Sequence, residues 1–342
     1  MNKRIILIVI SISLMICGII GYNFYQHIFG NLVAKTGEIY IKSTDNISDV
    51  KTALNEFIGN KNKFNWLVEK KNYQKPKAGK YIITKDMSLN DVVNLLRSGN
   101  QTPVKISFNN QNTLENLAGR ISTQIEADSI SLLQSFTNPK FLSEEKITNA
   151  QVLSYFIPNT YELFWNTSAE KFTNRMVKEY HRFWNDKRLE KAKALNLSPS
   201  QVITLASIVQ KETPKTIEQP RVAGLYLNRI KKGMPLQADP TIIYILKQKN
   251  GQDFTVKRVL FKDLKIKSLY NTYLHKGIPP GPIAMPDISA IDAVLDYEKH
   301  NYLYMCVNVE KLGYHAFANS MNQHKKNARK YQGWLNNQGI KR

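Results

Sequence analysis

The chain has 342 residues, which is long enough for two modest domains and a membrane anchor. Its 48 Lys and Arg residues outnumber its 27 Asp and Glu residues, and the formal net charge of +21 suits polyanions such as anionic lipid headgroups or wall polymers. The basic residues are spread along the chain, as a general compositional bias would also produce, and no nucleic-acid-binding motif is present. We therefore expect no nucleic-acid partner.

The N-terminus predicts a membrane anchor. Lys3 and Arg4 precede an almost uninterrupted apolar run over residues 5–20, which continues into a group of aromatic residues. This length suits one membrane-spanning helix, and the basic residues on its short side place the N-terminus in the cytoplasm. A cleavable signal peptide is the alternative, but residues 19–22 offer no small-x-small cleavage site. We expect residues 1–29 to be a cytoplasmic tip and a retained transmembrane helix, with the rest of the chain outside the cytoplasm.

The two cysteines lie in different parts of the chain. Cys17 is within the predicted span and Cys306 is in the soluble part, so they cannot pair within one molecule. A lipid-modified Cys17 is a further alternative for the anchor, but Ile16 before it is too bulky for the usual lipobox. The soluble part must therefore rely on its hydrophobic cores for stability.

Residues 37–103 predict a small unit of strands and helices. Residues 38–41 alternate as a strand does, and residues 77–83 indicate a turn that leads into a second strand. Ser88 is the predicted cap of a helix that Gly99 closes.

A larger mixed domain is predicted at residues 154–342. Residues 104–153 predict a strand and short helices that bridge the two units, and residues 156–162 are expected in a loop. Later elements are predicted as a helix over 221–230, a β-hairpin of 302–307 with 313–317, and a basic helix over 319–335. These patterns together predict the α+β class.

One helix of this domain ends in a carboxylate. Ser198 is its predicted cap, Pro199 its first residue and Gln201 the capping-box partner, and Pro214 stops it. Its apolar face is built by Val202, Leu205, Ile208 and Val209. Glu212 lies on the same face, where desolvation would raise its pKa as a general acid requires. The alternative is a carboxylate that turns to solvent at a fraying helix end.

Four motifs carry a resemblance to a known family. They are LASIVQKET, VAGLYLNRIKKGMPLQADPTIIY, YNTYLHKGIPPGPIAMP and YHAFANSMNQH, in this order within residues 154–331. Together they resemble the YceG-like family of membrane-bound endolytic murein transglycosylases (MltG). The resemblance implies that Glu212 is the catalytic glutamate, while Gln210 stands where members often carry a second acid. It also implies that residues 37–103 are a LysM-like subdomain, a type of module that binds glycans containing N-acetylglucosamine.

The same resemblance selects candidate substrate-binding residues, whose aromatic, amide and hydroxyl groups suit a sugar cleft. These are Gln237, Asp239, Thr241, Tyr270, Asn271, Thr272, Tyr273, Gly277, Pro280, His315 and Asn319. Asp239 also has a structural explanation, as the cap of a helix with Pro240 in its first turn. The six histidines show no metal-ligand spacing, and no nucleotide or metal motif is present, so we expect no metal and no cofactor.

The expected reaction is lytic cleavage of the bond between N-acetylmuramic acid and N-acetylglucosamine within nascent glycan strands. One carboxylate suffices for it, because the muramyl 6-hydroxyl attacks its own anomeric carbon and leaves a 1,6-anhydro end. A membrane-anchored muramidase, in which Asp239 activates water, is the first alternative, and a non-enzymatic glycan-binding wall anchor is the second. The resemblance further implies a single-pass protein of the bacterial cytoplasmic membrane, with peptidoglycan strands and peptidoglycan synthases as its partners.

Overall fold

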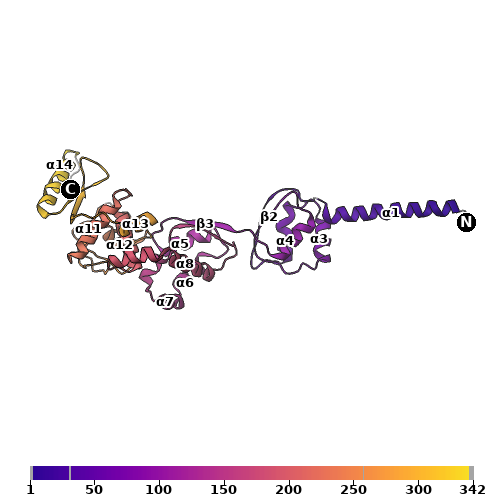
Figure 1. Cartoon of the computed structure of the whole chain (residues 1–342), viewed down its shortest axis with the longest axis horizontal. Helices are drawn as coiled ribbons and strands as arrows, with labels where there is room; N and C mark the ends of the chain where they lie inside the picture. The colour runs from indigo at the N-terminus through magenta and orange to yellow at the C-terminus, as the bar shows by residue number, and fades with distance from the viewer. Residues whose placement is uncertain (1–2, 31, 257, 339–342) are drawn as a thin grey trace. The chain divides into compact units, whose positions relative to one another are not determined.

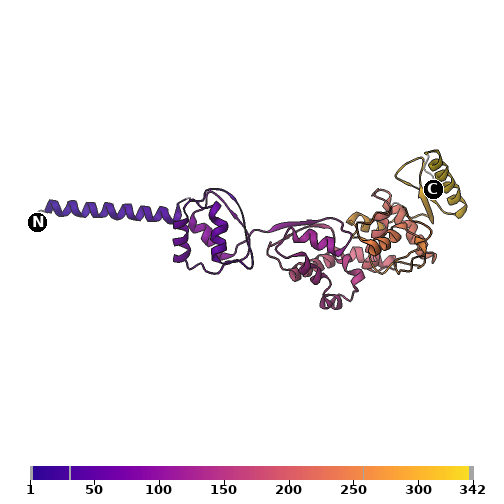
Figure 2. The same cartoon turned by 180° about the vertical axis from the view of Figure 1, so that it is seen from behind.

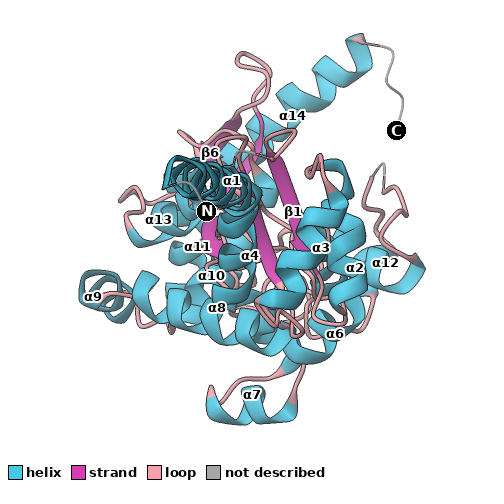
Figure 3. Cartoon of the chain, turned by 90° about the vertical axis from the view of Figure 1, so that its right-hand side faces the viewer, coloured by secondary structure: helices cyan, strands magenta, loops and turns pink. Residues whose placement is uncertain are grey.

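The computed structural model describes residues 3–30, 32–256 and 258–338. Helices, coloured cyan in Figure 3, make up most of it and the described strands pair in twos, so the predicted α+β class is confirmed. Residues 1–2 of the predicted cytoplasmic tip and residues 339–342 of the predicted larger domain lie outside the described residues. The chain divides into two compact units. Unit 1 comprises Met1–Ile106, Thr123–Ala127 and Tyr161–Ser168, and unit 2 comprises Ser107–Ser122, Asp128–Thr160 and Ala169–Arg342.

The N-terminal helix α1 (Lys3–Phe29) is continuous and is drawn in indigo in Figures 1 and 2. Its segment Arg4–Gln26 has a mean hydropathy of 2.7, and none of the tested stretch is buried inside the protein. Among the described helices it alone is long and apolar enough to cross a membrane. By length and composition it therefore fits a single-pass anchor.

Unit 1 contains a two-stranded antiparallel sheet and short helices. β1 (Gly37–Ile41) pairs with β2 (Gly79–Ile83), so that Ile39 lies opposite Tyr81. The helices are α2 (Ile47–Ala53), the 3₁₀ helix η1 (Leu54–Glu56), α3 (Lys61–Lys70) and α4 (Leu89–Ser98). The strands and helices share one hydrophobic core, which includes Ile39, Ile41, Val50, Leu54, Leu67, Tyr81, Ile83, Val92 and Leu96.

The ends of α4 are fixed by local interactions. Ser88 and Asp91 form a capping box at its start, and Gly99 ends it in the left-handed conformation with φ of 73°. Both caps were predicted, because each depends on only a few neighbouring residues.

The strand β3 (Val104–Phe108) pairs with β4 (Asn159–Leu163), and each of the two strands is divided between unit 1 and unit 2. The elements between and after them are α5 (Leu114–Ser122), α6 (Ser129–Phe136), α7 (Pro139–Glu144), the 3₁₀ helix η2 (Asn149–Tyr155), α8 (Ala169–Phe183) and α9 (Asp186–Ala194). Aromatic side chains hold this region, with Tyr155 stacked on Tyr180 at 4.0 Å between ring centroids. The prediction of a loop over residues 156–162 is confirmed for residues 156–158 and was wrong for residues 159–162, where pairing with the distant β3 makes a strand.

The second part of unit 2 is built around α10 (Pro199–Glu212), which packs against η2, α9 and three helices that follow it in the chain. These are α11 (Gln219–Lys231), α12 (Asp239–Asn250) and α13 (Ile288–Leu295), with the 3₁₀ helix η3 (Asp263–Lys265) between the last two. Ser198 and Gln201 form the predicted capping box. The helix is buried on every side from Val202 to Val209, whereas the sequence predicted a single apolar face. Burial of its polar positions is tolerated because their hydroxyls donate to backbone carbonyls of the same helix.

A hairpin and a helix complete unit 2. β5 (Tyr304–Val307) pairs antiparallel with β6 (His315–Ala318), so that Met305 lies opposite Phe317. The helix α14 (Met321–Asn337) packs against both strands. The predicted hairpin and closing helix are therefore present, with boundaries shifted by about two residues, as is usual at element ends.

Candidate active site

Glu212 lines a cavity of about 470 Å³ in unit 2. It is the last residue of α10, and its side chain is 18% exposed. Burial raises the pKa of its carboxyl above the ordinary value of 4.5, whereas the positive charge that a protonated His315 would carry and the hydrogen bond from Tyr226 act in the opposite direction. Burial thus shifts the carboxyl towards its neutral form, which is the form that a general acid needs in order to donate a proton.

Tyr226 decides which oxygen of Glu212 carries the proton. It lies on α11, and its hydroxyl donates to Oε2 of Glu212 over 3.2 Å. Burial raises the pKa of Tyr226 well above 10, so the phenol stays a neutral donor. Because Oε2 accepts this hydrogen bond, the proton of the neutral acid belongs on Oε1.

Arg229 lies one turn after Tyr226 on α11 and supports the cavity wall. Its Nε donates to the carbonyl of Leu303 over 2.6 Å, and its Nη1 donates to the carbonyl of Leu236 over 2.9 Å. Nη1 also reaches the side-chain oxygen of Gln237 over 3.2 Å. One buried guanidinium thus ties α11 to the loop before α12 and to the start of the hairpin.

Asp239 faces the cavity and does not cap α12. The capping position is Ala238, and Asp239 is the first residue of the helix, without the predicted side-chain cap. Instead its Oδ1 accepts a hydrogen bond from the hydroxyl of Tyr273 over 2.5 Å. Gln237 just before it has φ of 52°, which is uncommon for a residue other than glycine and is typical of functional loops. The cap prediction was wrong because the unusual backbone turn moves the helix start by one residue.

His315 connects Glu212 to a second buried carboxylate, Glu218. Its Nε2 is 4.0 Å from Oε1 of Glu212, and its Nδ1 is 2.9 Å from Oε2 of Glu218. The backbone N–H of His315 donates to Oε1 of Glu218 over 2.7 Å. The start of β6 is thereby fixed to the start of α11.

The cavity combines acids, cations, rings and amides. Its lining residues are Glu212, Leu225, Tyr226, Arg229, Leu236, Gln237, Asp239, Arg258, Val259, Tyr273, Met305, Cys306, Val307, His315 and Tyr331. Among the residues that the structure describes, no group of three or more His, Cys, Asp or Glu side chains is arranged to hold a metal ion. The arrangement suits proton transfer from one desolvated acid to a polar ligand held between aromatic and amide groups.

Comparison with known proteins decides the family, since the YceG-like family matches residues 39–330. The chain belongs to the YceG-like family. It is 29% identical over 314 residues to the endolytic murein transglycosylase of Bacillus subtilis strain 168, covering 86% of this chain and 85% of that protein. It is 27% identical over 349 aligned positions to a protein of the same name from Streptococcus pneumoniae strain D39, covering 90% of this chain and 61% of that protein.

A solved structure of a YceG-like protein has a related fold. The 2.6 Å crystal structure of this Listeria monocytogenes protein matches with a TM-score of 0.56 and 27% identity, covering 85% of this chain and 98% of that chain. The four motifs that resemble the YceG-like family therefore belong to a chain whose fold is related to that of a solved YceG-like protein.

In the chain described here, four of the predicted substrate-binding residues line the same cavity as Glu212, namely Gln237, Asp239, Tyr273 and His315. Three others are buried and are used within the fold. The side-chain amide of Asn271 donates to two backbone carbonyls of the preceding loop. Thr272 accepts the backbone N–H of Ala238, and Thr241 donates to the carbonyl of Ala238. Thr272 and Thr241 thus fix the backbone at Ala238, which lies between Gln237 and Asp239. Direct substrate binding by these three residues stays a prediction.

The remaining predicted residues do not line the cavity. Tyr270 packs against Tyr244, with ring centroids 4.7 Å apart. Gly277 has φ of 82°, a left-handed turn that favours glycine, and Pro280 is exposed three residues later in the same loop. Asn319 is exposed just beyond β6. Contact of these residues with a long glycan also stays a prediction.

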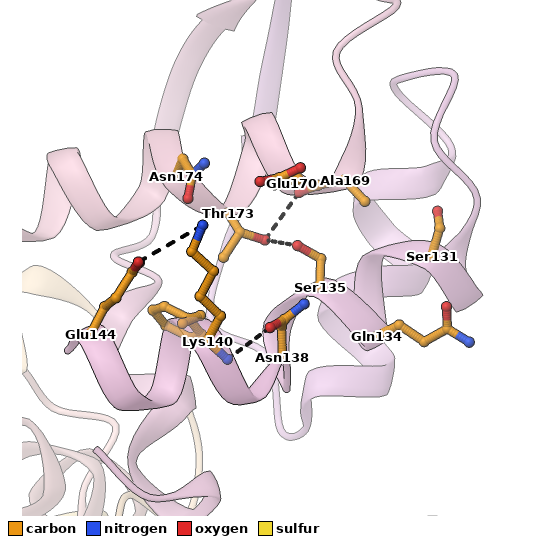
Figure 4. A pocket seen from close by; sticks show the side chains of 11 residues that line it. Ser131, Gln134, Ser135, Asn138, Lys140, Glu144, Ala169, Glu170, Thr173 and Asn174 are labelled. Carbon is orange, nitrogen blue, oxygen red and sulfur yellow. Dashed lines mark hydrogen bonds and ion pairs between the residues drawn. The ribbon is translucent and has the colours of Figure 1, made fainter. Parts of the chain in front are cut away.

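A second cavity of about 300 Å³ lies between α6, α7 and α8 (Figure 4). Several of the polar groups that line it form hydrogen bonds or ion pairs with one another or with the backbone. The hydroxyls of Ser135 and Thr173 are 2.6 Å apart, and Thr173 also donates to the carbonyl of Ala169. Lys140 lies 4.0 Å from Glu144 at its rim. Glu212 and the other residues of the first cavity do not line it.

Sequence reasoning missed Tyr226, Arg229 and Glu218. Tyr226 and Arg229 are three residues apart in a helix, so a shared face could have been inferred from their spacing. Glu218 carried no local signal, because its partner His315 is 97 residues later.

Proposed function

We propose that this chain is an endolytic murein transglycosylase, a lyase, in which Glu212 is the catalytic acid and base. The observation that carries the proposal is the Glu212 carboxyl, which lines a polar cavity and whose pKa is raised by desolvation. The family membership and the names of the Bacillus and Streptococcus relatives support the same reaction.

The proposed chemistry needs one acid that acts twice. Glu212 donates its proton to the glycosidic oxygen, and the bond from that oxygen to the anomeric carbon of the muramyl residue breaks. The oxygen of the muramyl 6-hydroxyl bonds to the same carbon, and its proton returns to Glu212. No water is consumed, and an intramolecular hydroxyl has a proximity advantage over free water. The products are a 1,6-anhydromuramyl end and a free 4-hydroxyl on N-acetylglucosamine.

A muramidase is the second candidate, and Asp239 is the observation that favours it. The sequence offered Glu212 without an evident partner acid, yet Asp239 lines the same cavity. Hydrolysis of a glycoside ordinarily uses two carboxylates. The hydrogen bond from Tyr273 occupies one oxygen of Asp239 and leaves the other for a water molecule.

Product analysis separates the two reactions. Purified peptidoglycan digested by the full chain should yield fragments that end in 1,6-anhydro-N-acetylmuramic acid, as seen by mass spectrometry. The hydrolytic product is heavier by one water and has a reducing end. An inactive Glu212→Gln preparation controls for contaminating enzymes. Mainly reducing ends would make the chain a muramidase.

We also propose that residues 37–103 are a LysM-like module that binds the glycan. A core that these residues mostly build themselves supports this. The isolated segment should be retained on insoluble peptidoglycan, and soluble N-acetylglucosamine oligomers should release it. Retention no greater than that of an unrelated protein of equal charge would show that the segment is only a spacer.

The proposed placement is a single-pass protein of the bacterial cytoplasmic membrane, with α1 as anchor and residues 154–342 as the extracytoplasmic catalytic domain. The apolar span of α1 supports the membrane anchor. The murein named as the substrate of the Bacillus relative supports placing the catalytic domain on the outer side of the membrane. Association with peptidoglycan synthases stays a prediction.

A further inference from the structure

Glu218 is a buried carboxylate that the reaction described above does not use. The residue is 4% exposed and occupies the position before the first turn of α11, yet its side chain does not cap that helix. Both of its oxygens instead accept hydrogen bonds from His315. A carboxylate is buried at a cost unless it is paired, so two bonds to one residue indicate a specific task.

The bonds to Glu218 determine the proton positions on His315. An ionised carboxylate only accepts hydrogen bonds, so Nδ1 of His315 must carry a hydrogen. In the neutral ring, Nε2 is then an acceptor. It faces Oε1 of Glu212, the oxygen that carries the acidic proton, at 4.0 Å. That distance is too long for a direct hydrogen bond, so the ring lies beside the acid without binding its proton.

The orientation matters because Glu212 must act twice. An N–H aimed at Oε1 would stabilise the ionised carboxylate after the first proton transfer and make it a weaker base for the second. A lone pair at the same place does not. We propose that Glu218 is a positioning residue, which holds the His315 ring so that its acceptor nitrogen faces the reacting oxygen of Glu212. This inference rests on the proposed function.

The substitution Glu218→Gln tests it. The amide offers one acceptor and one donor, so if its oxygen keeps the backbone N–H, its NH₂ group meets Nδ1 and the ring proton moves to Nε2. NMR of the full chain with ¹⁵N-labelled histidine should show the two ring nitrogens of His315 exchanging their shifts. We expect kcat to fall by about 10²-fold while KM changes by about twofold or less, because the wrong tautomer affects the reacting state.

Three further variants make the test specific. Glu218→Asp restores a carboxylate and should recover part of the lost kcat. Glu298→Gln removes a partly exposed carboxylate that pairs with Arg221 of α11, and it should change neither kcat nor the tautomer. In a His315→Gln background, Glu218→Gln should cost about twofold or less in kcat, since both act through one ring.

Independent, additive losses at the two positions would overturn the proposal, as would a wild-type His315 whose hydrogen is on Nε2. The NMR spectrum of the wild-type chain shows which ring nitrogen of His315 carries the hydrogen, so it tests the proposal even if Glu218→Gln does not fold. If the wild-type chain cleaves no peptidoglycan, the proposed function fails. The tautomer measurement would still report whether Glu218 positions His315.

Discussion

Glu212→Gln should reduce peptidoglycan cleavage by about 10²–10⁴-fold, the range typical of a lost general acid and base. The amide is close in shape to the protonated acid, so the hydrogen bond from Tyr226 can persist. It has no proton to give to the glycosidic oxygen and cannot take one from the muramyl hydroxyl. Release of soluble fragments from purified peptidoglycan, measured at several substrate concentrations, gives the loss directly.

A matched control is Glu310→Gln, which makes the same chemical change at an exposed residue paired with Lys330. It should retain near wild-type turnover, because an exposed ion pair contributes about 1 kcal/mol or less. Turnover by Glu212→Gln within a few-fold of wild type would show that another group supplies the proton.

The Glu212→Gln variant should also have a higher Tm than the wild type at high pH. Burial raises the pKa of Glu212 in the folded state above 4.5, so the folded protein binds more protons than the unfolded chain in the window above that value. Stability contributed by Glu212 is therefore present below pH 4.5 and is lost as the pH rises through the raised pKa. Each pKa unit corresponds to about 1.4 kcal/mol. The Tm difference between the variant and the wild type should be near zero at pH 4 and positive at pH 8.

The place of Glu212 could be predicted from sequence because its determinants are local. Ser198 and Gln201 set the start of α10, and the helical period then fixes which residues share a side with Glu212. The burial of α10 on every side from Val202 to Val209 could not be predicted, because it depends on other helices packing around it, chiefly α11, α12 and α13. Local patterns describe a helix better than its surroundings.

The wrong cap prediction for Asp239 and the missed role of Glu218 have the same physical cause. Asp239 leaves its expected capping role because Gln237, in a left-handed conformation, and Thr272, 34 residues after Ala238, set the loop before α12. Glu218 meets His315 only when β6 reaches the start of α11. Both contacts join segments that are distant in the chain, so no spacing rule could indicate them. The family motifs identified the region of the site but could not supply its hydrogen bonds.

Arg229 carries the second large expected effect, on stability. Its guanidinium is 7% exposed and donates to carbonyls at Leu303, Pro235 and Leu236, which belong to two different segments. Arg229→Met should cost about 3 kcal/mol or more in unit 2, since each buried acceptor left without a donor costs about 1–3 kcal/mol. Arg229→Lys should rescue little, because a single ammonium cannot bond both segments at once.

Hydrogen exchange of α10 and α11 in the full chain measures this loss, because it reports the opening of unit 2 without assuming two-state unfolding of the whole protein. Arg221→Met is the matched control, since it removes an arginine of the same helix whose side chain is 46% exposed and pairs with Glu298. That change should cost about 1 kcal/mol or less. Equal losses at the two positions would mean that the segments beside α11 are held by their packing, and that Arg229 does not support the loop carrying Gln237 and Asp239.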